Sequence, residues 1–320
     1  MQFYDFKEIE ERVILIGVQT EQDEDVAASL DELEELAATA GAVTVGKVIQ
    51  NREAVHPGTY IGKGKIEEVA ALLAAYDANG VICDDELSPA QMNNLERELD
   101  CKVMDRTLLI LDIFAGRATT SEGKIQVELA QLRYRSARLV GLRESLSRLG
   151  GGIGTRRPGE KKLETDRRLI RTRISALKAE LAQVEKHREL IRGKRTRGNL
   201  KTAAIVGYTN AGKSTLLNTL TGAGILAEDK LFATLDPTTR VLELKDGQQI
   251  LLTDTVGFIR KLPHHLVEAF KSTLEEAKYA DYIIHVVDAS NPQAELQMHT
   301  VYETLRELGA TGKKDHYTPE

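Results

Sequence analysis

The stretch Gly207-Tyr-Thr-Asn-Ala-Gly212-Lys213-Ser214 constrains the fold of this 320-residue chain more than any other feature. It fits the pattern G-x-x-x-x-G-K-[ST] and lies between the apolar run TAAIV and the helical pattern TLLNTLTG. In such a loop, glycines let backbone N–H groups converge on phosphates, and the following helix points its positive end at the same anion. Lys213 would neutralise the β- and γ-phosphates, and Ser214 would offer a hydroxyl to Mg²⁺. We therefore expect a nucleotide-binding α/β domain.

A second motif, Asp254-Thr255-Val256-Gly257, follows a hydrophobic strand pattern about 40 residues after the loop. An aspartate at this place is expected to reach Mg²⁺ through a water molecule. The segment FATLDPTTR, residues 232–240, lies between the two motifs and would carry the threonine that completes the magnesium coordination. We choose Thr234 for this role over Thr238 and Thr239.

The chain divides into three patterned regions. Residues 1–115 alternate between strand and helix patterns, which is typical of a small α/β domain with a largely parallel sheet. Residues 116–196 hold two long helical patterns with apolar seams around the glycine-rich break LGGGIGTRRPGEKK, which predicts an antiparallel helical hairpin. Residues 197–320 contain the two motifs, and the turn of a hairpin within this region is expected at Asp246-Gly247. A dimeric coiled coil is a minor alternative for the seams.

The net charge of −6 is unevenly distributed. Residues 121–198 contain 21 Lys and Arg against 9 Asp and Glu, a net charge of +12, so the rest of the chain is acidic. A basic module on an acidic body favours a polyanionic partner. Because Tyr134 is the only aromatic residue of the hairpin, we expect recognition of folded RNA by shape and backbone contacts. The basic residues at or near the tip are Arg148, Arg156, Arg157, Lys161, Lys162, Arg167, Arg168, Arg171 and Arg173.

A second glycine-rich loop, HPGTYIGKGKIEE from His56 to Glu68, opens a helical pattern. Taken alone, it is more consistent with a structural loop than with a binding site. The alternative is a phosphate contact, from RNA or a second nucleotide, through Lys63, Lys65 and the helix N-terminus.

Together, the phosphate loop, FATLDPTTR, DTVGF, the basic hairpin and HPGTYIGKGK resemble the HflX family of ribosome-associated bacterial GTPases, over nearly the whole chain to about Gly312. The resemblance implies an N-terminal α/β domain, a helical hairpin and a Ras-like G domain. It also implies GTP hydrolysis stimulated by the large ribosomal subunit, with a role in rescuing or splitting stalled ribosomes under stress.

Carried over to this sequence, the resemblance assigns catalysis to Lys213, Thr234 and Gly257, and Mg²⁺ to Ser214, Thr234 and, through water, Asp254. GTP and GDP would be bound by the loop and by two switch segments. The loop residues are Gly207, Tyr208, Thr209, Asn210, Ala211, Gly212, Lys213, Ser214 and Thr215; the switch residues are Phe232, Ala233, Thr234, Leu235, Asp236, Asp254, Thr255, Val256 and Gly257.

Phe258 stands where many GTPases keep a glutamine that orients the attacking water. A phenyl ring cannot hydrogen-bond water, so a backbone group, another switch residue or the partner must hold it. We therefore expect slow hydrolysis by the protein alone and faster hydrolysis when it is docked. Asn210 suggests a further hypothesis, because related GTPases use an asparagine here to hold a potassium ion that acts like an arginine finger.

The C-terminal sequence departs from the family. After the helical pattern ending near Leu308 the chain reads ELGATGKKDHYTPE, without the Asn-Lys-x-Asp motif that reads guanine. We interpret Gly312-Lys-Lys-Asp315 as coincidence and the G domain as truncated. This leaves two alternatives open, an RNA-dependent P-loop ATPase and a non-catalytic RNA-binding fragment. It also predicts that the strand DYIIHVVDA is an exposed apolar sheet edge.

The remaining sequence features concern membrane spans, export signals and cysteines. No apolar run approaches the roughly 20 residues of a membrane span, and the N-terminus lacks a signal-peptide layout. Cys83 and Cys101 match no metal or redox spacing, so both are expected to be buried thiols. We expect a cytoplasmic monomer.

Overall fold

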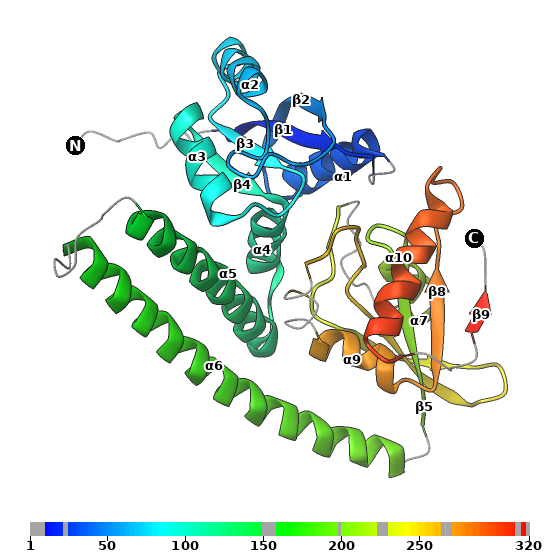
Figure 1. Cartoon of the computed structure of the whole chain (residues 1–320). Coiled ribbons are helices and arrows are strands. Elements are labelled where there is room, and N and C mark those ends of the chain that lie inside the picture. Colours follow the sequence, from blue (N-terminus) through cyan, green and yellow to red (C-terminus); the bar gives the residue numbers. More distant parts are fainter. Residues whose placement is uncertain are drawn as a thin grey trace, which may run out of the picture. The chain divides into compact units, whose positions relative to one another are not determined.

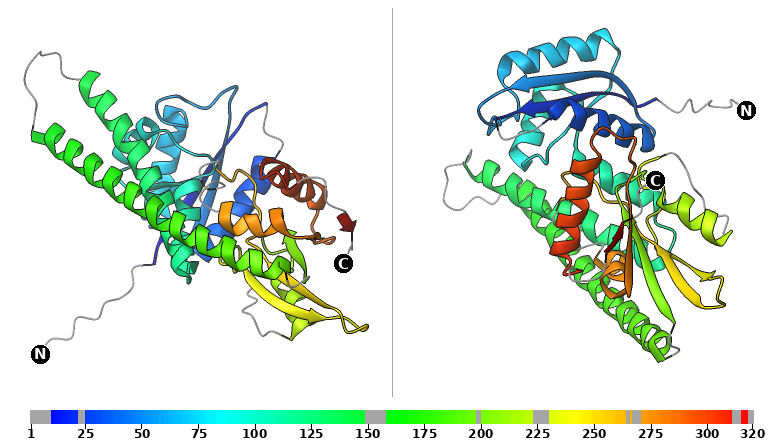
Figure 2. Two further views of the ribbon diagram at one scale, coloured as in Figure 1. Left: turned by 90° about the horizontal axis from the view of Figure 1, so that it is seen from below. Right: turned by 90° about the vertical axis from the view of Figure 1, so that its right-hand side faces the viewer.

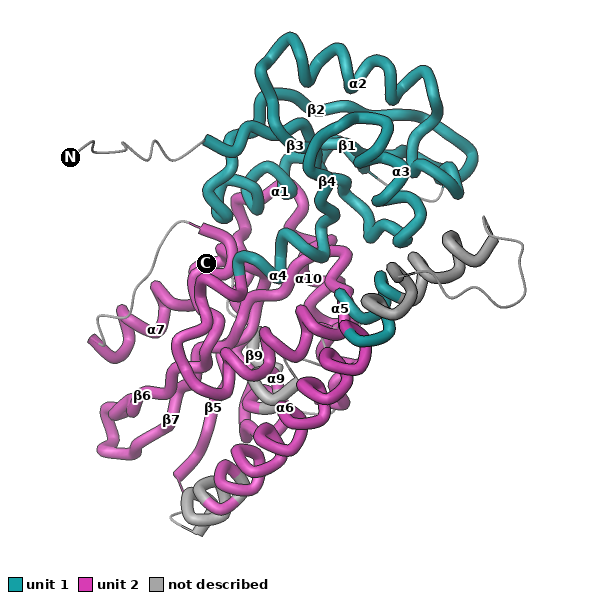
Figure 3. The backbone as a smooth tube through the Cα atoms, turned by 90° about the vertical axis from the view of Figure 1, so that its left-hand side faces the viewer, with its two compact units in different colours: residues 1–113, 135–165 teal, residues 114–134, 166–320 magenta. Residues whose placement is uncertain are grey.

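The computed structural model describes residues 10–21, 25–148, 158–197, 200–222, 230–263, 266, 271–310 and 315–317. The chain forms two compact units, shown in Figure 3. Unit 1 contains residues 1–113 and 135–165, and unit 2 contains residues 114–134 and 166–320. This division differs from the three sequence regions because each unit includes part of the helical hairpin. The domain boundaries at residues 115 and 196 stay a prediction.

Unit 1 contains a four-stranded, all-parallel sheet in the order β2-β1-β3-β4, as the alternating sequence pattern predicted (Figure 1). Parallel neighbours need crossover connections, which the helices provide. In chain order the elements are β1 (Arg12–Gln19), α1 (Val26–Thr39), β2 (Val43–Asn51), α2 (Lys63–Ala75), β3 (Gly80–Cys83), α3 (Pro89–Leu99), β4 (Lys102–Asp105) and α4 (Arg106–Arg117).

Side chains of β1 alternate between two covered faces of this sheet. Ile14, Ile16 and Val18 pack in one core with residues of α2 and α3. On the other face, a Cβ at Gly17 would lie 2.5 Å from a side-chain carbon of Val26 in α1. Both faces are therefore buried, which explains why RVILIGV reads as a continuous apolar run.

The start of α3 is fixed by side-chain capping. The Ser88 hydroxyl accepts the Gln91 N–H, the Gln91 side chain accepts the Ser88 N–H, and Pro89 occupies the first turn. These reciprocal bonds satisfy two otherwise unpaired donors and fix where the helix begins.

Unit 2 contains a five-stranded sheet in the order β6-β7-β5-β8-β9, parallel except for β6. The β6–β7 hairpin turns at Gly247, whose φ of +78° suits glycine, as the Asp-Gly pair predicted. In chain order the elements are β5 (Lys201–Gly207), α7 (Lys213–Thr221), β6 (Thr238–Glu243), β7 (Gln249–Asp254), α9 (Lys271–Tyr279), β8 (Tyr282–Val286), α10 (Ala294–Glu307) and β9 (Asp315–Tyr317).

The prediction that β8 is a bare sheet edge is wrong. Strand β9 pairs with it in parallel, Ile283 opposite Asp315 and His285 opposite Tyr317. Sheet pairing uses backbone groups, so a short polar strand without an apolar run can cover an edge. Of the stretch Gly312-Lys-Lys-Asp315, only Asp315 lies within the described residues.

Two long helices, α5 (Ser121–Arg148) and α6 (Pro158–Arg197), form the predicted hairpin and run side by side in Figures 1 and 2. Within unit 2 they are antiparallel, because Glu122 pairs with Arg188 and Glu128 pairs with Arg173. The seam buries Ile125, Leu129 and Leu177, with Leu132, Ile174 and Leu181 packed beside them. The heptad spacing thus identified the contact face correctly.

None of the helices in the described part of the chain is long and apolar enough to cross a membrane. Both cysteines are free thiols; Cys83 is buried, whereas Cys101 is only half-buried. The expectation of two buried thiols is therefore correct for Cys83 alone.

We predict that Leu177→Ala lowers the free energy of unfolding by about 2–5 kcal/mol, because this fully buried side chain would leave a cavity in the seam. The matched control is Leu169→Ala, on the same helix but 60% exposed, which should change little. Urea unfolding followed by far-ultraviolet circular dichroism measures both. Equal losses for the two variants would contradict the packing role of the seam.

Candidate nucleotide-binding site

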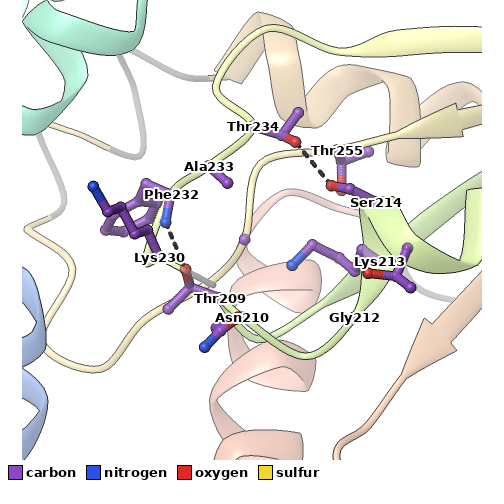
Figure 4. A pocket seen from close by; sticks show the side chains of 12 residues that line it. Thr209, Asn210, Gly212, Lys213, Ser214, Lys230, Phe232, Ala233, Thr234 and Thr255 are labelled. Atoms are coloured by element: carbon purple, nitrogen blue, oxygen red, sulfur yellow. Dashed lines mark hydrogen bonds between the residues drawn. The ribbon is translucent and has the colours of Figure 1, made fainter. Parts of the chain in front are cut away.

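A cavity with about 400 Å³ of open space lies at the carboxyl end of β5, in unit 2 (Figure 4). This is the edge at which parallel α/β sheets bind ligands. Its lining comes from the phosphate loop, the segment before β6 and the end of β7. The residues are Thr209, Asn210, Gly212, Lys213, Ser214, Thr215, Lys230, Phe232, Ala233, Thr234, Thr255 and Gly257.

Two glycines shape the phosphate loop. A Cβ at Gly207 would lie 2.4 Å from the Val286 carbonyl oxygen, so only glycine lets β5 end beside β8. Gly212 has a φ of +87° and precedes the first residue of α7. Asn210 also has a positive φ, 61°, a conformation that asparagine tolerates better than most residues. The loop therefore ends at a helix N-terminus that faces the cavity.

Lys213, the first residue of α7, is buried within the loop. Its ammonium donates to the Tyr208 carbonyl oxygen at 2.6 Å. Burial lowers the pKa of Lys213 to about 8, although the nearby Asp254 carboxylate opposes this shift. A buried cation beside a helix N-terminus suits a polyphosphate, whose charge replaces the lost hydration.

Three side-chain oxygens converge beside the lysine. The Ser214 hydroxyl lies 2.7 Å from Asp254 Oδ2 and 2.9 Å from the Thr234 hydroxyl. Asp254 is fully buried, and its Oδ1 has no hydrogen-bond partner among the described residues. Burial raises the pKa of Asp254 in spite of the Ser214 and Lys213 contacts. Oxygen donors of this kind, with one orphaned carboxylate oxygen, fit a hard divalent cation such as Mg²⁺.

The segment after β7 lies directly against the phosphate loop. A Cβ at Gly257 would lie 2.6 Å from Thr209 Cα and 3.0 Å from Lys213 Nζ. The next residue bonds to the loop through its backbone: the Thr209 N–H donates to the Phe258 oxygen, and the Phe258 N–H donates to the Gly207 oxygen. The Phe258 side chain is buried and does not line the cavity. It is a packing residue and does not hold water.

Residues of the segment before β6 contact two different parts of unit 2, the phosphate loop and the residues just before α5. The Phe232 N–H donates to the Thr209 hydroxyl at 2.8 Å, and Thr234 reaches Ser214. Leu235 is buried, and neither it nor Asp236 lines the cavity described above. The Asp236 carboxylate instead accepts four hydrogen bonds from Thr119 and Thr120. The resemblance implies that Leu235 and Asp236 bind the nucleotide, and this assignment stays a prediction; the structure shows Leu235 buried and Asp236 bonded to Thr119 and Thr120.

The other threonines considered for the metal lie in the β6–β7 hairpin. Thr239 bonds to the Thr253 hydroxyl at 2.9 Å, and Thr238 is opposite Asp254 in the sheet register. Among the remaining predicted residues, Thr215 and Ala233 line the cavity, the Thr255 hydroxyl donates to the Ile205 oxygen, and Tyr208, Ala211 and Val256 are buried. Sequence reasoning missed Lys230, which lines the cavity; its only signal was a positive charge just before FATLDPTTR.

In unit 1, the glycine-rich loop from His56 is tied down by internal bonds. The His56 Nδ1 atom lies within hydrogen-bond distance of the Gly58 and Thr59 N–H groups, and the Gly62 N–H donates to the Gln50 side chain. Lys65 pairs with Glu68 at 2.7 Å. These contacts favour the structural interpretation of this loop over a phosphate contact.

Part of the basic surface predicted for the hairpin lies within the described residues. Arg168 and Arg171 are exposed on α6, whereas one guanidinium edge of Arg173 donates from Nε and Nη2 to the two Glu128 carboxylate oxygens at 2.7 and 2.8 Å. Tyr134 is buried and has no face open to a base. The side chains of Arg148, Arg156, Arg157, Lys161 and Lys162 lie outside the described residues.

Three family models match consecutive parts of the chain. They describe a GTP-binding GTPase N-terminal region at residues 27–115, a GTP-binding GTPase middle region at residues 117–195, and a 50S ribosome-binding GTPase at residues 202–316. The third match contains the phosphate loop and both segments that contact it.

Relatives match nearly the whole chain in sequence. GTPase HflX of Lacrimispora saccharolytica is 74% identical over 309 residues, which cover 97% of this chain and 73% of that protein. GTPase HflX of Escherichia coli is 48% identical over 300 residues, covering 94% of this chain and 70% of that protein. Among solved structures, SsGBP in complex with GDP has a TM-score of 0.53 and 28% identity, and the match covers 95% of this chain and 81% of that one.

The sheet, the phosphate loop and the two segments against it define a P-loop GTPase. Within that class, the chain belongs to the HflX family of GTPases, which hydrolyse GTP. The resemblance found in the sequence is confirmed.

We predict that Gly257→Ala lowers kcat for GTP hydrolysis about a hundredfold, because the added methyl would displace this segment from Thr209 and Lys213. Single-turnover hydrolysis measures the effect. The control is Gly64→Ala in α2, where no described atom lies within 4 Å of the new methyl. A Gly257→Ala rate within twofold of the original would exclude the close approach as a requirement.

Proposed function

We propose that this protein couples GTP hydrolysis to its association with the large ribosomal subunit, and that it acts on stalled ribosomes during stress. The convergence of Lys213, Ser214, Thr234 and Asp254 at the N-terminus of α7 carries the nucleotide half of this proposal. The match to a 50S ribosome-binding GTPase supports the ribosomal half. We also propose that the protein is a monomer in the cytoplasm.

Ser214 and Thr234 would hold Mg²⁺ directly, and Asp254 would hold it through water. The described residues contain no cluster of three or more His, Cys, Asp or Glu side chains that could hold a metal ion. When bound, Mg²⁺ would supply positive charge that neutralises the charge developing on the phosphates. The Lys213 ammonium, which lies at the loop, would neutralise and orient the same phosphates.

Phe258 is buried against the phosphate loop and cannot take the place of the missing glutamine. We expect the attacking water to be held by a backbone group near Gly257 or by the docked partner, which makes the protein alone slow. Asn210, which lines the cavity, is the candidate holder of a potassium ion beside the phosphates.

The basic hairpin would contact ribosomal RNA through phosphates. Support comes from its net charge of +12 over residues 121–198 and from the exposure of Arg168 and Arg171 on α6. Contacts of this kind release counterions, so binding should weaken steeply with salt. The buried Tyr134 argues against base stacking as the source of affinity.

The experiment that tests the proposal measures GTP and ATP hydrolysis by the 320-residue chain, each with and without large ribosomal subunits. We predict that the subunits accelerate GTP hydrolysis more than about tenfold, since the partner completes the water site. ATP should be hydrolysed more slowly under both conditions. A preference for ATP would indicate an RNA-dependent ATPase. Salt-sensitive subunit binding without nucleotide dependence would indicate a non-catalytic RNA-binding protein.

The same assay is repeated with potassium and with sodium as the only monovalent cation. Faster hydrolysis in potassium would support the role of Asn210, and Asn210→Ala should then remove the difference. Equal rates in the two buffers would exclude a potassium site.

For the metal ligands, we predict that Thr234→Val lowers the affinity for a Mg²⁺-bound GTP analogue about tenfold, because a valine of the same shape has no oxygen for the metal. The matched control is Thr239→Val, which removes only a hydroxyl bonded to Thr253 in the hairpin. Fluorescent-nucleotide titrations with and without Mg²⁺ measure both. The assignment of Thr234 fails if Thr239→Val has the larger effect.

A further inference from the structure

We infer that Asp236 is a positioning residue that holds the segment carrying Thr234 to the start of hairpin helix α5. Through this contact, the binding of GTP or GDP would affect the hairpin. We call the contact of Asp236 with Thr119 and Thr120 the clasp. The inference rests on the proposed function of Thr234 as a metal ligand and deepens it, because it assigns the coupling between nucleotide and RNA to named residues.

Both carboxylate oxygens of Asp236 are used in the clasp. Oδ2 accepts the Thr119 N–H at 2.8 Å, the Thr119 hydroxyl at 2.7 Å and the Thr120 N–H at 2.9 Å; Oδ1 accepts the Thr120 hydroxyl at 2.6 Å. Four donors on one half-buried carboxylate are strong, charge-assisted contacts. Burial alone would raise the pKa of Asp236, but the bonds from Thr120 and Thr119 outweigh it and lower the pKa.

The clasp is also the N-terminal cap of α5. The Thr120 hydroxyl accepts the Gly123 N–H at 3.0 Å, and the Thr120 carbonyl accepts the Lys124 N–H at 3.0 Å. Asp236 therefore places its negative charge at the positive end of a long helix. The carboxylate beside the first turn of α5 therefore comes from Asp236, in the segment before β6, and not from α5 itself.

Two further contacts make the clasp specific. A Cβ at Gly123 would lie 2.4 Å from Asp236 Oδ1, so only glycine leaves room for the carboxylate. The Phe232 ring packs edge-on against Phe114, which precedes α5, with ring centroids 4.7 Å apart. The segment is thus held to the residues before and within α5 at two places, on either side of Thr234.

Chain geometry then links the clasp to the metal site. Asp236 is two residues after Thr234, and two residues span at most about 7 Å of extended chain. While the bonds of Asp236 to Thr119 and Thr120 hold, Thr234 must stay within this reach of the start of α5. A rearrangement that carries Thr234 beyond this reach therefore also acts on α5, and by thermodynamic linkage the reverse holds equally.

The first test uses nucleotide alone, so it decides the clasp without the ribosome. We expect Asp236→Ala to lower the affinity for a non-hydrolysable GTP analogue with Mg²⁺ about tenfold, while GDP affinity changes less than about twofold. GDP has no γ-phosphate for Thr234 to sense. The control is Asp246→Asn, in the exposed β6–β7 turn. Equal losses for both nucleotides, or no loss for either, would overturn the inference.

Conservative substitutions separate the clasp from a general folding defect. Thr120→Ser keeps the hydroxyl and should keep the original analogue affinity, whereas Thr120→Val should lower it. Gly123→Ala, whose methyl would strike Asp236, should behave like Asp236→Ala, while Gly116→Ala in α4 has no described atom within 4 Å and should not. Because Gly123 and Asp236 are in contact, the double variant should lose no more than one single variant. Additive losses would contradict the clasp.

The last test measures the affinity for large ribosomal subunits with the GTP analogue and with GDP. We expect Asp236→Ala to bring the ratio of the two affinities close to one, with binding still weakened by salt. An unchanged ratio would overturn the coupling through the clasp. If the unsubstituted protein itself shows a ratio of one, the proposed ribosomal function fails, while the nucleotide titrations still decide the clasp.

Discussion

One residue of the phosphate loop, Thr209, holds both flanking segments in place. Its N–H donates to the Phe258 oxygen at 2.7 Å, and its hydroxyl accepts the Phe232 N–H at 2.8 Å. The residue is buried, so these bonds are protected from water. Because Gly257 lies against the Thr209 backbone and Thr234 is two residues beyond Phe232, the position of Thr209 sets the geometry of the whole site. Thr234, the proposed metal ligand, and Asp236 of the clasp follow Phe232 closely on the segment that Thr209 holds.

This arrangement explains why a phenylalanine can follow Gly257. The structure uses the backbone of Phe258 as a short parallel bridge to Tyr208, and the ring contributes apolar burial that anchors the bridge. A glutamine would give a polar side chain that could reach water, but it would weaken this anchor. This chain therefore fixes the segment by packing at the position where many GTPases place a catalytic amide.

Local patterns predicted most of the fold. The phosphate loop between β5 and α7, the turn at Gly247 and the apolar seams of the hairpin all depend on residues within about a turn or a heptad of each other. Pairings set by the tertiary fold could not be predicted. Asp236 and Thr119 are 117 residues apart, β9 has no apolar pattern, and Lys230 reaches the cavity from a polar segment. Asp236 was assigned to the nucleotide as part of the switch segment that the resemblance implies, and the sequence holds no local signal of its contact with Thr119.

Two loops of this chain show why residue types alone do not define a phosphate site. Both contain glycines and lysines, and both open a helix. In the loop before α2, the N–H groups of Gly58, Thr59 and Gly62 bond to His56 and Gln50, and its lysines point outward to Glu68 or solvent. In the loop before α7, Lys213 is buried at the cavity with a pKa lowered to about 8. A buried ammonium group at the wall of a cavity is typical of functional sites, and here it suits an anionic ligand.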